Sequence, residues 1–407
     1  MTTWFAPGRV EVLGKHTDYA GGRCLVMALD RGVTATVADA PGNAHGDTLT
    51  ARSLTMPDEI DLRSDAALPA GHWGNYLTTV VQRLEHNFGP LRGGHLTIDT
   101  TLPLASGMSS SSAMIVAAAL ALAHHNGFPR TDAWTAHLDD PAALATYLAC
   151  VENGAGFGPL TGLRGVGTRG GSEDHTAMVM SRPGELGLFD FSSDVPVRER
   201  SLRLDPDLRF VVVMSGVLAE KTGPALAHYN RSSELARAAV AVWNEATGRA
   251  DANLGAALRE VPDARARLTA LVRGDAELAR RVHQFLTESE DLIPSAADAL
   301  SAGDLAGFGD LVAASQAGAD AGLGNQTPET RALVATALDQ AAHAASAFGA
   351  GYGGSVWALV DRADADGFAE AWLARYRRDF RQHADAASVL VTQPSGSVRE
   401  MDPHRAP

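Results

Sequence analysis

The chain has 407 residues, of which 45% are hydrophobic and 20% are charged, and its formal net charge is −14. A chain of this length is long for one hydrophobic core, so we expect two packed domains. The acidic balance argues against a nucleic-acid surface and against electrostatic binding to anionic membranes.

Cysteine content and apolar runs indicate the compartment. Cys24 and Cys150 are the only cysteines, too few for a disulfide framework or a cysteine-based zinc site, which is consistent with a reducing cytoplasm. The first residues lack the basic region and apolar core of an export signal. The most apolar run, 113–123, is about half of the roughly 20 residues that a membrane-spanning helix requires. We therefore expect a cytoplasmic protein without a membrane segment.

Hydrophobic periodicity predicts a mixture of strands and helices. The elements expected in chain order are a hairpin over 9–40 with its turn at 19–22, a helix at 77–84, a strand at 95–102, a helix at 144–151, a glycine-rich loop at 154–171, a strand buried on both faces at 208–214, mostly helix over 225–348, a strand at 355–360 and a frayed tail after 392. A loop as long as 154–171 is more often functional than structural.

The segment Pro103-Leu-Ala-Ser-Gly-Met-Ser-Ser-Ser-Ser-Ala113 runs directly into an alanine-rich apolar stretch that predicts a helix. A loop of Gly and Ser at a helix start offers backbone N–H groups, hydroxyl donors and the positive end of the helix dipole to an anion. The chain contains no Walker loop, and its one Gly-x-Gly-x-x-Gly, at 349–354, precedes a strand instead of linking a strand to a helix. The serine loop is thus a candidate phosphate site, although such loops also occur without a ligand.

Two further segments accompany the serine loop. The first is Gly8-Arg-Val-Glu-Val-Leu-Gly-Lys-His-Thr-Asp-Tyr-Ala-Gly-Gly22, and the other is Gly349-Ala-Gly-Tyr-Gly-Gly-Ser355. The order and spacing of the three resemble the signature motifs of the GHMP small-molecule kinases. The first resembles the galactokinase branch, whose usual text is Gly-Arg-Val-Asn-Leu-Ile-Gly-Glu-His-Thr-Asp-Tyr-Asn-Gly-Gly. The likeness includes Trp73-Gly-Asn-Tyr76 and Gly171-Ser-Glu-Asp174 and covers most of the chain.

The resemblance implies an α+β, two-domain GHMP kinase fold with the active site in the cleft between the domains. The expected parts are an N-terminal ribosomal-protein-like domain over 1–195, a C-terminal ferredoxin-like domain over 196–395 and a tail over 396–407. The implied reaction is the phosphorylation of a sugar at its anomeric hydroxyl by ATP and Mg²⁺, which gives a sugar 1-phosphate. The expected partners are therefore the sugar and ATP.

The catalytic pair implied by the resemblance is Asp174 with Arg9. Phosphoryl transfer to a hydroxyl needs an acceptor for its proton and a cation near the developing charge. Asp174 would be the base, and Arg9 would keep that carboxylate ionised and stabilise the transferring phosphoryl group. Taken singly, Asp174 also fits a polar loop and Arg9 a surface ion pair.

The ATP and metal site implied by the resemblance centres on the serine loop. The expected ATP-contacting residues are Trp73, Gly107, Ser109, Ser110, Ser111 and Ser112. Ser111 and Glu152 would bind Mg²⁺, since a hard cation prefers oxygen ligands. Trp73 would stack on adenine, but a lone Trp is more often a core residue. A surface position at a helix end is the alternative for Glu152.

The expected sugar-binding residues are Lys15, His16, Asp18, Gly171 and Tyr229. Asp18 suits a carboxylate that accepts from two neighbouring hydroxyls, whereas His16 and Tyr229 also fit structural hydrogen bonds. Galactokinases carry Glu at the position of Lys15, facing carbon 6 of the sugar. A cation there reverses what the pocket can bind. We therefore hypothesise that Lys15 pairs with an acidic or phosphorylated distal end of the sugar; alternatively it turns to solvent or to Glu11.

Three other interpretations stay open. One is a galactokinase that acts on plain galactose. Another is a relative with a different acceptor, of the mevalonate or homoserine type, against which the His16-Thr-Asp-Tyr19 segment argues. The third is a non-catalytic sugar and nucleotide sensor, against which the presence of Asp174, Arg9 and the serine loop argues. Ser112 stands where alanine is usual, and His175 where glutamine is usual.

Overall fold

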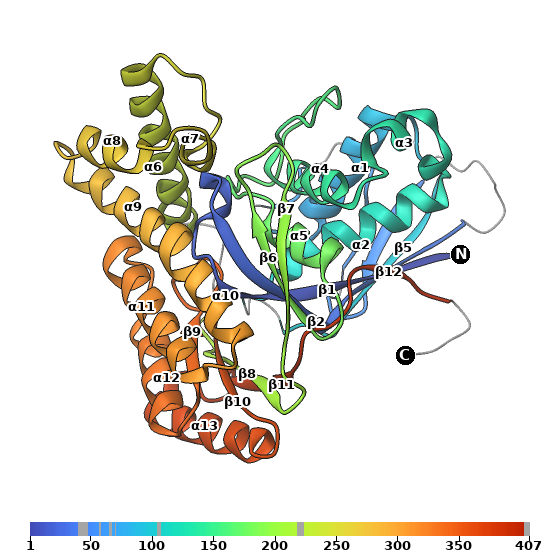
Figure 1. The fold of residues 1–407 in the computed structure, drawn as a ribbon. Helices are drawn as coiled ribbons and strands as arrows, with labels where there is room; N and C mark the ends of the chain where they lie inside the picture. The colour runs from blue at the N-terminus through green and yellow to red at the C-terminus, as the bar shows by residue number, and fades with distance from the viewer. Residues whose placement is uncertain are drawn as a thin grey trace.

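The computed structural model describes residues 1–39, 48–56, 58–64, 67–69, 71–103, 107–217 and 224–402, with only the backbone described for 224–229. Figure 1 shows two α+β halves beside each other, each containing a sheet with helices packed on it. The first half carries the N-terminal strands, and the second contains the long helical region and the later strands. The two-domain α+β fold expected from the sequence is confirmed.

In the described part of the chain, eight strands form the first sheet, in the order β12-β1-β2-β5-β3-β4, with β6 joined to β2 and β7 to β6. Their bounds are β1 (Thr2–Leu13), β2 (Arg23–Ala38), β3 (Leu49–Ser53), β4 (Glu59–Asp61), β5 (Gly94–Thr100), β6 (Glu185–Asp190), β7 (Val197–Arg203) and β12 (Arg399–Glu400). The long antiparallel pair β1–β2 is the hairpin predicted from residues 9–40. Because β7 pairs with β6, the first sheet extends beyond residue 195.

The helices of the first half pack around one central helix. They are η1 (Asp18–Ala20), α1 (Gly74–Phe88), α2 (Ser110–His125), η2 (Phe128–Arg130), α3 (Asp132–Leu138), α4 (Pro141–Asn153) and α5 (Glu173–Met180). Helix α2 is apolar on all sides and contacts β1, β2, α1, α4 and α5. A helix without a polar face is stable only when it is buried. Burial fixes α2, and with it the serine loop at its first turn.

The second sheet has the antiparallel order β11-β8-β10-β9. Its strands are β8 (Leu208–Met214), β9 (Ala344–Ala347), β10 (Ser355–Asp361) and β11 (Ser388–Thr392). Val211 and Val213 pack in one core cluster while Phe210 and Val212 pack in another. This alternation confirms that β8 is buried on both faces, as its lack of polar residues predicts.

Helices surround this sheet and extend beyond it. They are α6 (Pro224–Thr247), α7 (Leu254–Glu260), α8 (Ala264–Leu271), α9 (Ala276–Leu286), η3 (Thr287–Leu292), α10 (Ile293–Ser301), α11 (Leu305–Leu323), α12 (Pro328–Asp339), α13 (Ala365–Asp379) and η4 (Arg381–His383). Helices α6 to α9 share a core cluster with Ala20 of η1. The second half therefore holds the segment that follows β1.

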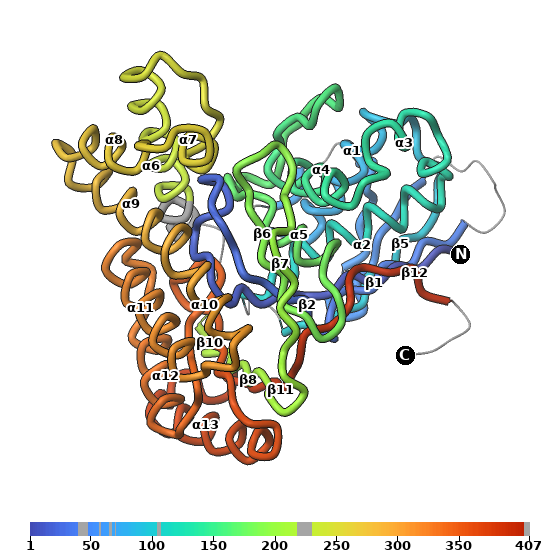
Figure 2. The backbone as a smooth tube through the Cα atoms, viewed as in Figure 1, coloured from blue at the N-terminus to red at the C-terminus, as the bar shows by residue number. Residues whose placement is uncertain are grey.

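The prediction of a frayed tail after residue 392 is wrong for the described residues up to 402, which pair with the first half. The N–H of Ser395 donates to the Ala28 carbonyl at 2.9 Å, and the N–H of Met401 donates to that of Thr3 at 2.8 Å. Strand β12 pairs with β1, and Figure 2 shows this segment returning to the first half. The pairing partner is at the other end of the chain, so local composition carried no sign of it.

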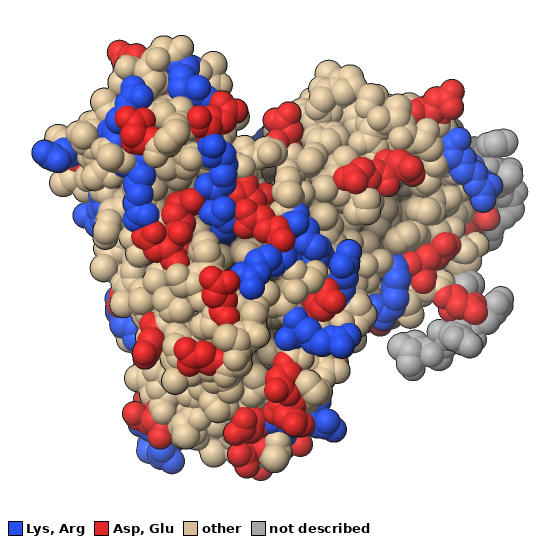
Figure 3. All heavy atoms as spheres, in the orientation of Figure 1, with Lys and Arg blue, Asp and Glu red and all other residues tan. Residues whose placement is uncertain are grey.

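Figure 3 shows acidic and basic side chains intermixed over one face of the molecule. Among the residues that the structure describes, no helix combines the length and apolarity needed to cross a membrane.

Candidate active site

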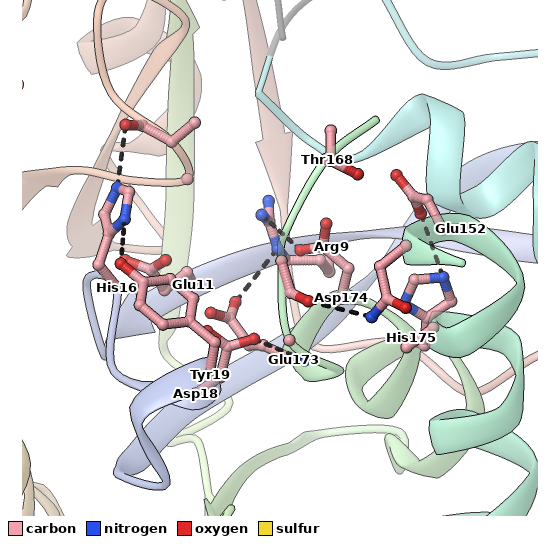
Figure 4. A pocket seen from close by; sticks show the side chains of 16 residues that line it. Arg9, Glu11, His16, Asp18, Tyr19, Glu152, Thr168, Glu173, Asp174 and His175 are labelled. Carbon is pink, nitrogen blue, oxygen red and sulfur yellow. Dashed lines mark hydrogen bonds and ion pairs between the residues drawn. The ribbon is translucent and has the colours of Figure 1, made fainter. Parts of the chain in front are cut away.

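A pocket lies where the two halves meet. It encloses about 540 Å³ of space free of protein atoms, a volume that includes solvent at its open side. Its walls come from β1, η1, α4, α5, the loop before α5, and residues 349–350. The predicted site residues that line it are Arg9, His16, Asp18, Glu152, Gly171 and Asp174. The structure thus brings together three separate stretches of the sequence, 9–18, 152 and 171–174 (Figure 4).

Strand β1 contributes Arg9 and Glu11 to the pocket. Residues two apart on a strand share one face. The pairing of β1 with β2 is irregular between Pro7 and Arg9 and again between Glu11 and Leu13. Such bulges redirect side chains and are common beside active sites. The local backbone therefore aims both charged side chains at the pocket.

Arg9 contacts residues from two other segments of the site, the serine loop and α5. Its Nη2 lies 2.6 Å from Asp174 Oδ1 and its Nε lies 3.3 Å from Glu173 Oε1. Its Nη1 donates to the Gly107 carbonyl at 2.6 Å. Burial alone would lower the pKa of Arg9, but the charges of Asp174 and Glu173 outweigh it and raise that pKa. The guanidinium therefore stays charged and joins the first motif, the serine loop and α5.

The N-terminus of α5 is fixed by Asp18. The N–H of Glu173 donates to Asp18 Oδ2 at 3.2 Å, an arrangement that places negative charge at the positive end of a helix. A Cβ added to Gly171 would lie 2.3 Å from that same oxygen. Only glycine fits at 171, so the close approach of this loop to Asp18 sets the position of Asp174.

The serine loop has the features of an anion site. Gly107 and Ser109 adopt left-handed backbone conformations with φ of 76° and 55°. The buried hydroxyl of Ser109 has no hydrogen-bond partner among the described residues. Ser110 and Ser111 form the first turn of α2 and are partly exposed. Free hydroxyl and amide donors at a helix start match the needs of phosphate oxygens.

Ser112 differs from its neighbours because it is fully buried. Its hydroxyl lies within hydrogen-bonding distance of Glu152 Oε2 at 2.7 Å and of Asp174 Oδ2 at 3.3 Å. Glu152 Oε2 also lies 3.2 Å from His175 Nε2. The hydroxyl that replaces the usual alanine is therefore engaged with two carboxylates of the pocket.

Glu152 is the one carboxylate among the two predicted metal ligands, and it accepts a hydrogen bond from Ser112 of the serine loop. In the described part of the chain, no three His, Cys, Asp or Glu residues are arranged as a metal cluster. Mg²⁺ in kinases is held by one or two carboxylates together with substrate phosphates and water. Glu152 and a hydroxyl of the serine loop would supply that donor set, so the residues present fit the ion.

His16 is held in place by hydrogen bonds to both ring nitrogens. Nδ1 lies 2.8 Å from Tyr19 Oη, and Nε2 lies 3.1 Å from the Ala350 carbonyl. Arg281 Nη2 donates to the His16 carbonyl at 2.5 Å. His16 thus links the first motif to the third. Tyr229 belongs to α6, and its side chain lies outside the described residues.

Lys15 does not line the pocket, which corrects the expectation that it faces the distal end of the substrate. It is 1% exposed, and its Nζ donates to Ser315 Oγ at 3.1 Å. Ser315 Oγ in turn donates to Glu288 Oε1 at 2.8 Å, as does the N–H of Gly14 at 3.0 Å. The physical reason is the buried hydroxyl of Ser315 in α11, which is bonded to Glu288 of η3; both residues lie far along the sequence from the motif, which could not reveal them.

Trp73 precedes α1 and is not among the residues that line the pocket. It packs at the edge of the core, and its ring lies 5.8 Å from that of His72 at an interplanar angle of 28°. These contacts fit the alternative of a core residue. Adenine stacking by Trp73 stays a prediction.

Several pocket residues were missed by sequence reasoning, among them Glu11, Tyr19 and Glu173. Burial raises the pKa of Glu11 to about 7. Burial, reinforced by the charge of Glu11, raises the pKa of Glu173 well above its usual value. Glu11 could have been noticed in the first motif, because galactokinases usually have asparagine at that position. For Glu173 the signal was its place beside Asp174.

Family models match three parts of the chain. The galactokinase galactose-binding signature matches residues 2–39, the GHMP kinases N terminal domain matches 75–156, and the GHMP kinases C terminal matches 296–378. The fold and the site therefore define an ATP-dependent sugar kinase of the GHMP type.

Curated relatives extend the match to nearly the whole chain. A galactokinase of Mycobacterium tuberculosis is 31% identical over 364 residues, covering 88% of this chain and 89% of the relative. One of Chloroflexus aurantiacus is 30% identical over 374 residues, covering 91% and 87%. The crystal structure of Lactococcus lactis galactokinase with galactose has the same fold, with a TM-score of 0.78 at 22% identity over 98% of this chain and 95% of that one. The chain belongs to the galactokinase family.

Proposed function

We propose that this kinase transfers the γ-phosphoryl group of ATP to the anomeric hydroxyl of a neutral hexose of the galactose type. The observation that carries the proposal is the 2.6 Å ion pair of Asp174 with Arg9. Arg9 also donates to the Gly107 carbonyl of the serine loop, and His16 and Asp18 line the same pocket as the pair.

The chemistry requires little more than these groups. Asp174 accepts the proton of the hydroxyl as its oxygen attacks the γ-phosphorus, and the bond from that phosphorus to the β,γ-bridging oxygen breaks. The products are the sugar 1-phosphate and ADP. Arg9 stabilises the charge of the transferring group. Ser109, Ser110 and Ser111 hold the phosphates, and Ser111 with Glu152 would hold Mg²⁺, which neutralises phosphate charge.

The charges of the pocket support a neutral sugar over the acidic one hypothesised from Lys15. Five carboxyl groups line the pocket, and Arg9 is the one Lys or Arg among the lining residues described: the carboxyl groups are those of Glu11, Asp18, Glu152, Glu173 and Asp174. A carboxylate or phosphate at the far end of the sugar would meet repulsion from the ionised members of this set, and the one lining cation, Arg9, is already paired with Asp174. The relatives described above are galactokinases, which supports the same substrate class.

A sensor that binds sugar and nucleotide without turnover is not supported, because the chain has both the Arg9–Asp174 ion pair and the serines of the serine loop.

The proposed function is tested by an ATP-consumption assay across galactose, other neutral hexoses, uronic acids and sugar phosphates, with the phosphorylated carbon assigned by phosphorus NMR. We expect turnover with a neutral hexose, product phosphorylated at carbon 1, and a loss of 10²-fold or more in kcat for Asp174→Asn. The matched control is Asp366→Asn, at an exposed position of α13. Turnover confined to acidic sugars would contradict the proposal.

A further inference from the structure

The carboxylate of Glu11 is buried, lines the pocket and has a free oxygen. The residue is 3% exposed, and its Oε1 has no hydrogen-bond partner among the described residues. A buried carboxylate oxygen without a donor is destabilising. Such a group calls for a ligand that donates to it.

The neighbouring cations do not meet this need. Lys15 Nζ donates to Ser315 Oγ, which itself bonds Glu288. Arg9 Nη1 donates to the Gly107 carbonyl and Nη2 lies 2.6 Å from Asp174 Oδ1, while Nε, which has no hydrogen-bond partner among the described residues, lies 3.3 Å from Glu173 Oε1. Both cations near Glu11 are therefore engaged by other acceptors, and neither satisfies its Oε1.

The location of Glu11 identifies the part of the substrate that it would meet. Figure 4 shows Glu11 on the same side of Arg9 as His16, Asp18 and Tyr19. Glu152 and His175, which connect to the serine loop through Ser112, lie on the other side. Glu11 thus faces the sugar end of the pocket, away from the phosphates.

We propose that Glu11 is a specificity-determining residue, whose free oxygen accepts a hydrogen bond from one hydroxyl of the hexose. The inference rests on the proposed function and adds to it a residue and a contact. The motif also supports it. The usual galactokinase text has a neutral residue at 11 and an acid at 15, whereas this chain has the acid at 11 and a cation at 15 that is directed away from the pocket. The carboxylate that accepts a hydrogen bond from the sugar is therefore on β1 in this chain, whereas the usual galactokinase motif has its acid on the loop that follows.

The experiment couples side-chain and sugar changes. The hexose that the wild-type enzyme phosphorylates best is compared with its 2-, 3-, 4- and 6-deoxy analogues. Binding is measured by calorimetry with and without a non-hydrolysable ATP analogue, and kcat and KM are measured separately. The variants are Glu11→Gln, which keeps a neutral acceptor, and Glu11→Leu, which removes the acceptor. Glu185→Gln is the matched control, because Glu185 of β6 also has a buried, unpartnered oxygen but lies outside the pocket.

We expect Glu11→Leu to weaken binding of the parent hexose about tenfold or more, with Glu11→Gln in between, since a hydrogen bond to a charged group is lost. One deoxy analogue, which lacks the hydroxyl that donates to Glu11, should bind the wild-type enzyme about tenfold more weakly than the parent hexose does. The same analogue should bind the wild-type enzyme and Glu11→Leu with equal affinity. The control should match wild type, and kcat should change less than KM. Ligand-free unfolding temperatures show whether Glu11→Leu folds, and Glu11→Gln carries the test if it does not.

Two failures are distinguishable. If the wild-type enzyme phosphorylates its hexose but both variants bind that hexose unchanged, or if every deoxy analogue loses affinity equally in the variants, the inference is overturned and the proposed function stands. If the wild-type enzyme phosphorylates no hexose, the proposed function is overturned first, and the inference falls with it.

Discussion

Arg9 Nη2 lies 2.6 Å from Asp174 Oδ1, and this contact joins β1 of the first motif to the first turn of α5. Both side chains are largely buried, with exposed fractions of 4% and 16%. A buried ion pair is strongly coupled, because removing one partner leaves the other charge uncompensated. The stability of the site and the proposed chemistry therefore depend on the same contact.

Arg9→Ala should reduce both stability and activity. The substitution leaves Asp174 and Glu173 buried without their cation, which typically costs about 3–5 kcal/mol, and it removes the positive charge beside the transferred group. Thermal unfolding and kcat measure the two effects. Arg92→Ala, at an exposed position of the first half, is the control and should behave like wild type. Full activity of Arg9→Ala would contradict the proposed chemistry.

Gly171→Ala should weaken sugar binding by disturbing Asp18. The new Cβ would lie 2.3 Å from Asp18 Oδ2 and 2.9 Å from the Tyr19 nitrogen, so the carboxylate must move away from the start of α5. We expect a rise in KM for the sugar of about tenfold, with a smaller fall in the unfolding temperature. Gly156→Ala in the same loop is the control, because its Cβ would meet nothing closer than 3.5 Å. Equal kinetics for the two variants would argue against this role of glycine 171.

Lys15→Met should destabilise the fold without changing the choice between neutral and acidic sugars. Lys15 donates to Ser315, which in turn donates to Glu288, so its replacement removes a buried hydrogen bond and leaves Ser315 Oγ without this donor, at a cost of about 1–3 kcal/mol. The ratio of kcat/KM for galactose to that for galacturonic acid should stay within about threefold of wild type. Adding Glu288→Gln should recover part of the stability. A large shift of that ratio toward galactose would revive the hypothesis that Lys15 binds an acidic group.

Glu11→Gln should change how stability depends on pH. Burial is the main cause that raises the pKa of Glu11 from 4.5 to about 7; Lys15 and Arg9 oppose the rise, whereas Glu288 and Asp18 add to it. Between these pH values the folded chain keeps a proton that the unfolded chain has lost. This group therefore lowers stability progressively as the pH rises from 4.5 to 7, with no further loss above.

Glutamine does not titrate and resembles the protonated acid. We expect the ligand-free unfolding temperatures of Glu11→Gln and wild type to coincide near pH 4.5 and to diverge toward pH 7.5, with the variant more stable by up to about 3 kcal/mol. A difference independent of pH would show that Glu11 does not titrate in this range. Glu185→Gln again serves as the control.

Much of the fold was predictable because it follows from local patterns of apolar, glycine and motif residues in the sequence. The apolar stretches on either side of the glycine turn at 19–22 predicted the β1–β2 hairpin, and the apolar run of 208–214 predicted a strand buried on both faces. The motifs predicted that Arg9, Asp18, Glu152 and Asp174 share a pocket. The return of β12 to β1 and the place of β7 in the first sheet were not predictable, since each depends on a partner strand whose identity local composition does not encode.

The sequence by itself determined the class of protein, the types of its main elements and the pairing of Arg9 with Asp174, because these depend on motif residues whose chemistry requires them to meet. Only the tertiary structure decided the direction of Lys15 and the burial of an unpartnered Glu11 oxygen beside the pocket. A buried charge turns toward the partner that satisfies it best. For Lys15 that partner is formed by Ser315 and Glu288, whose approach results from the packing of the two halves and not from any pattern within the first motif.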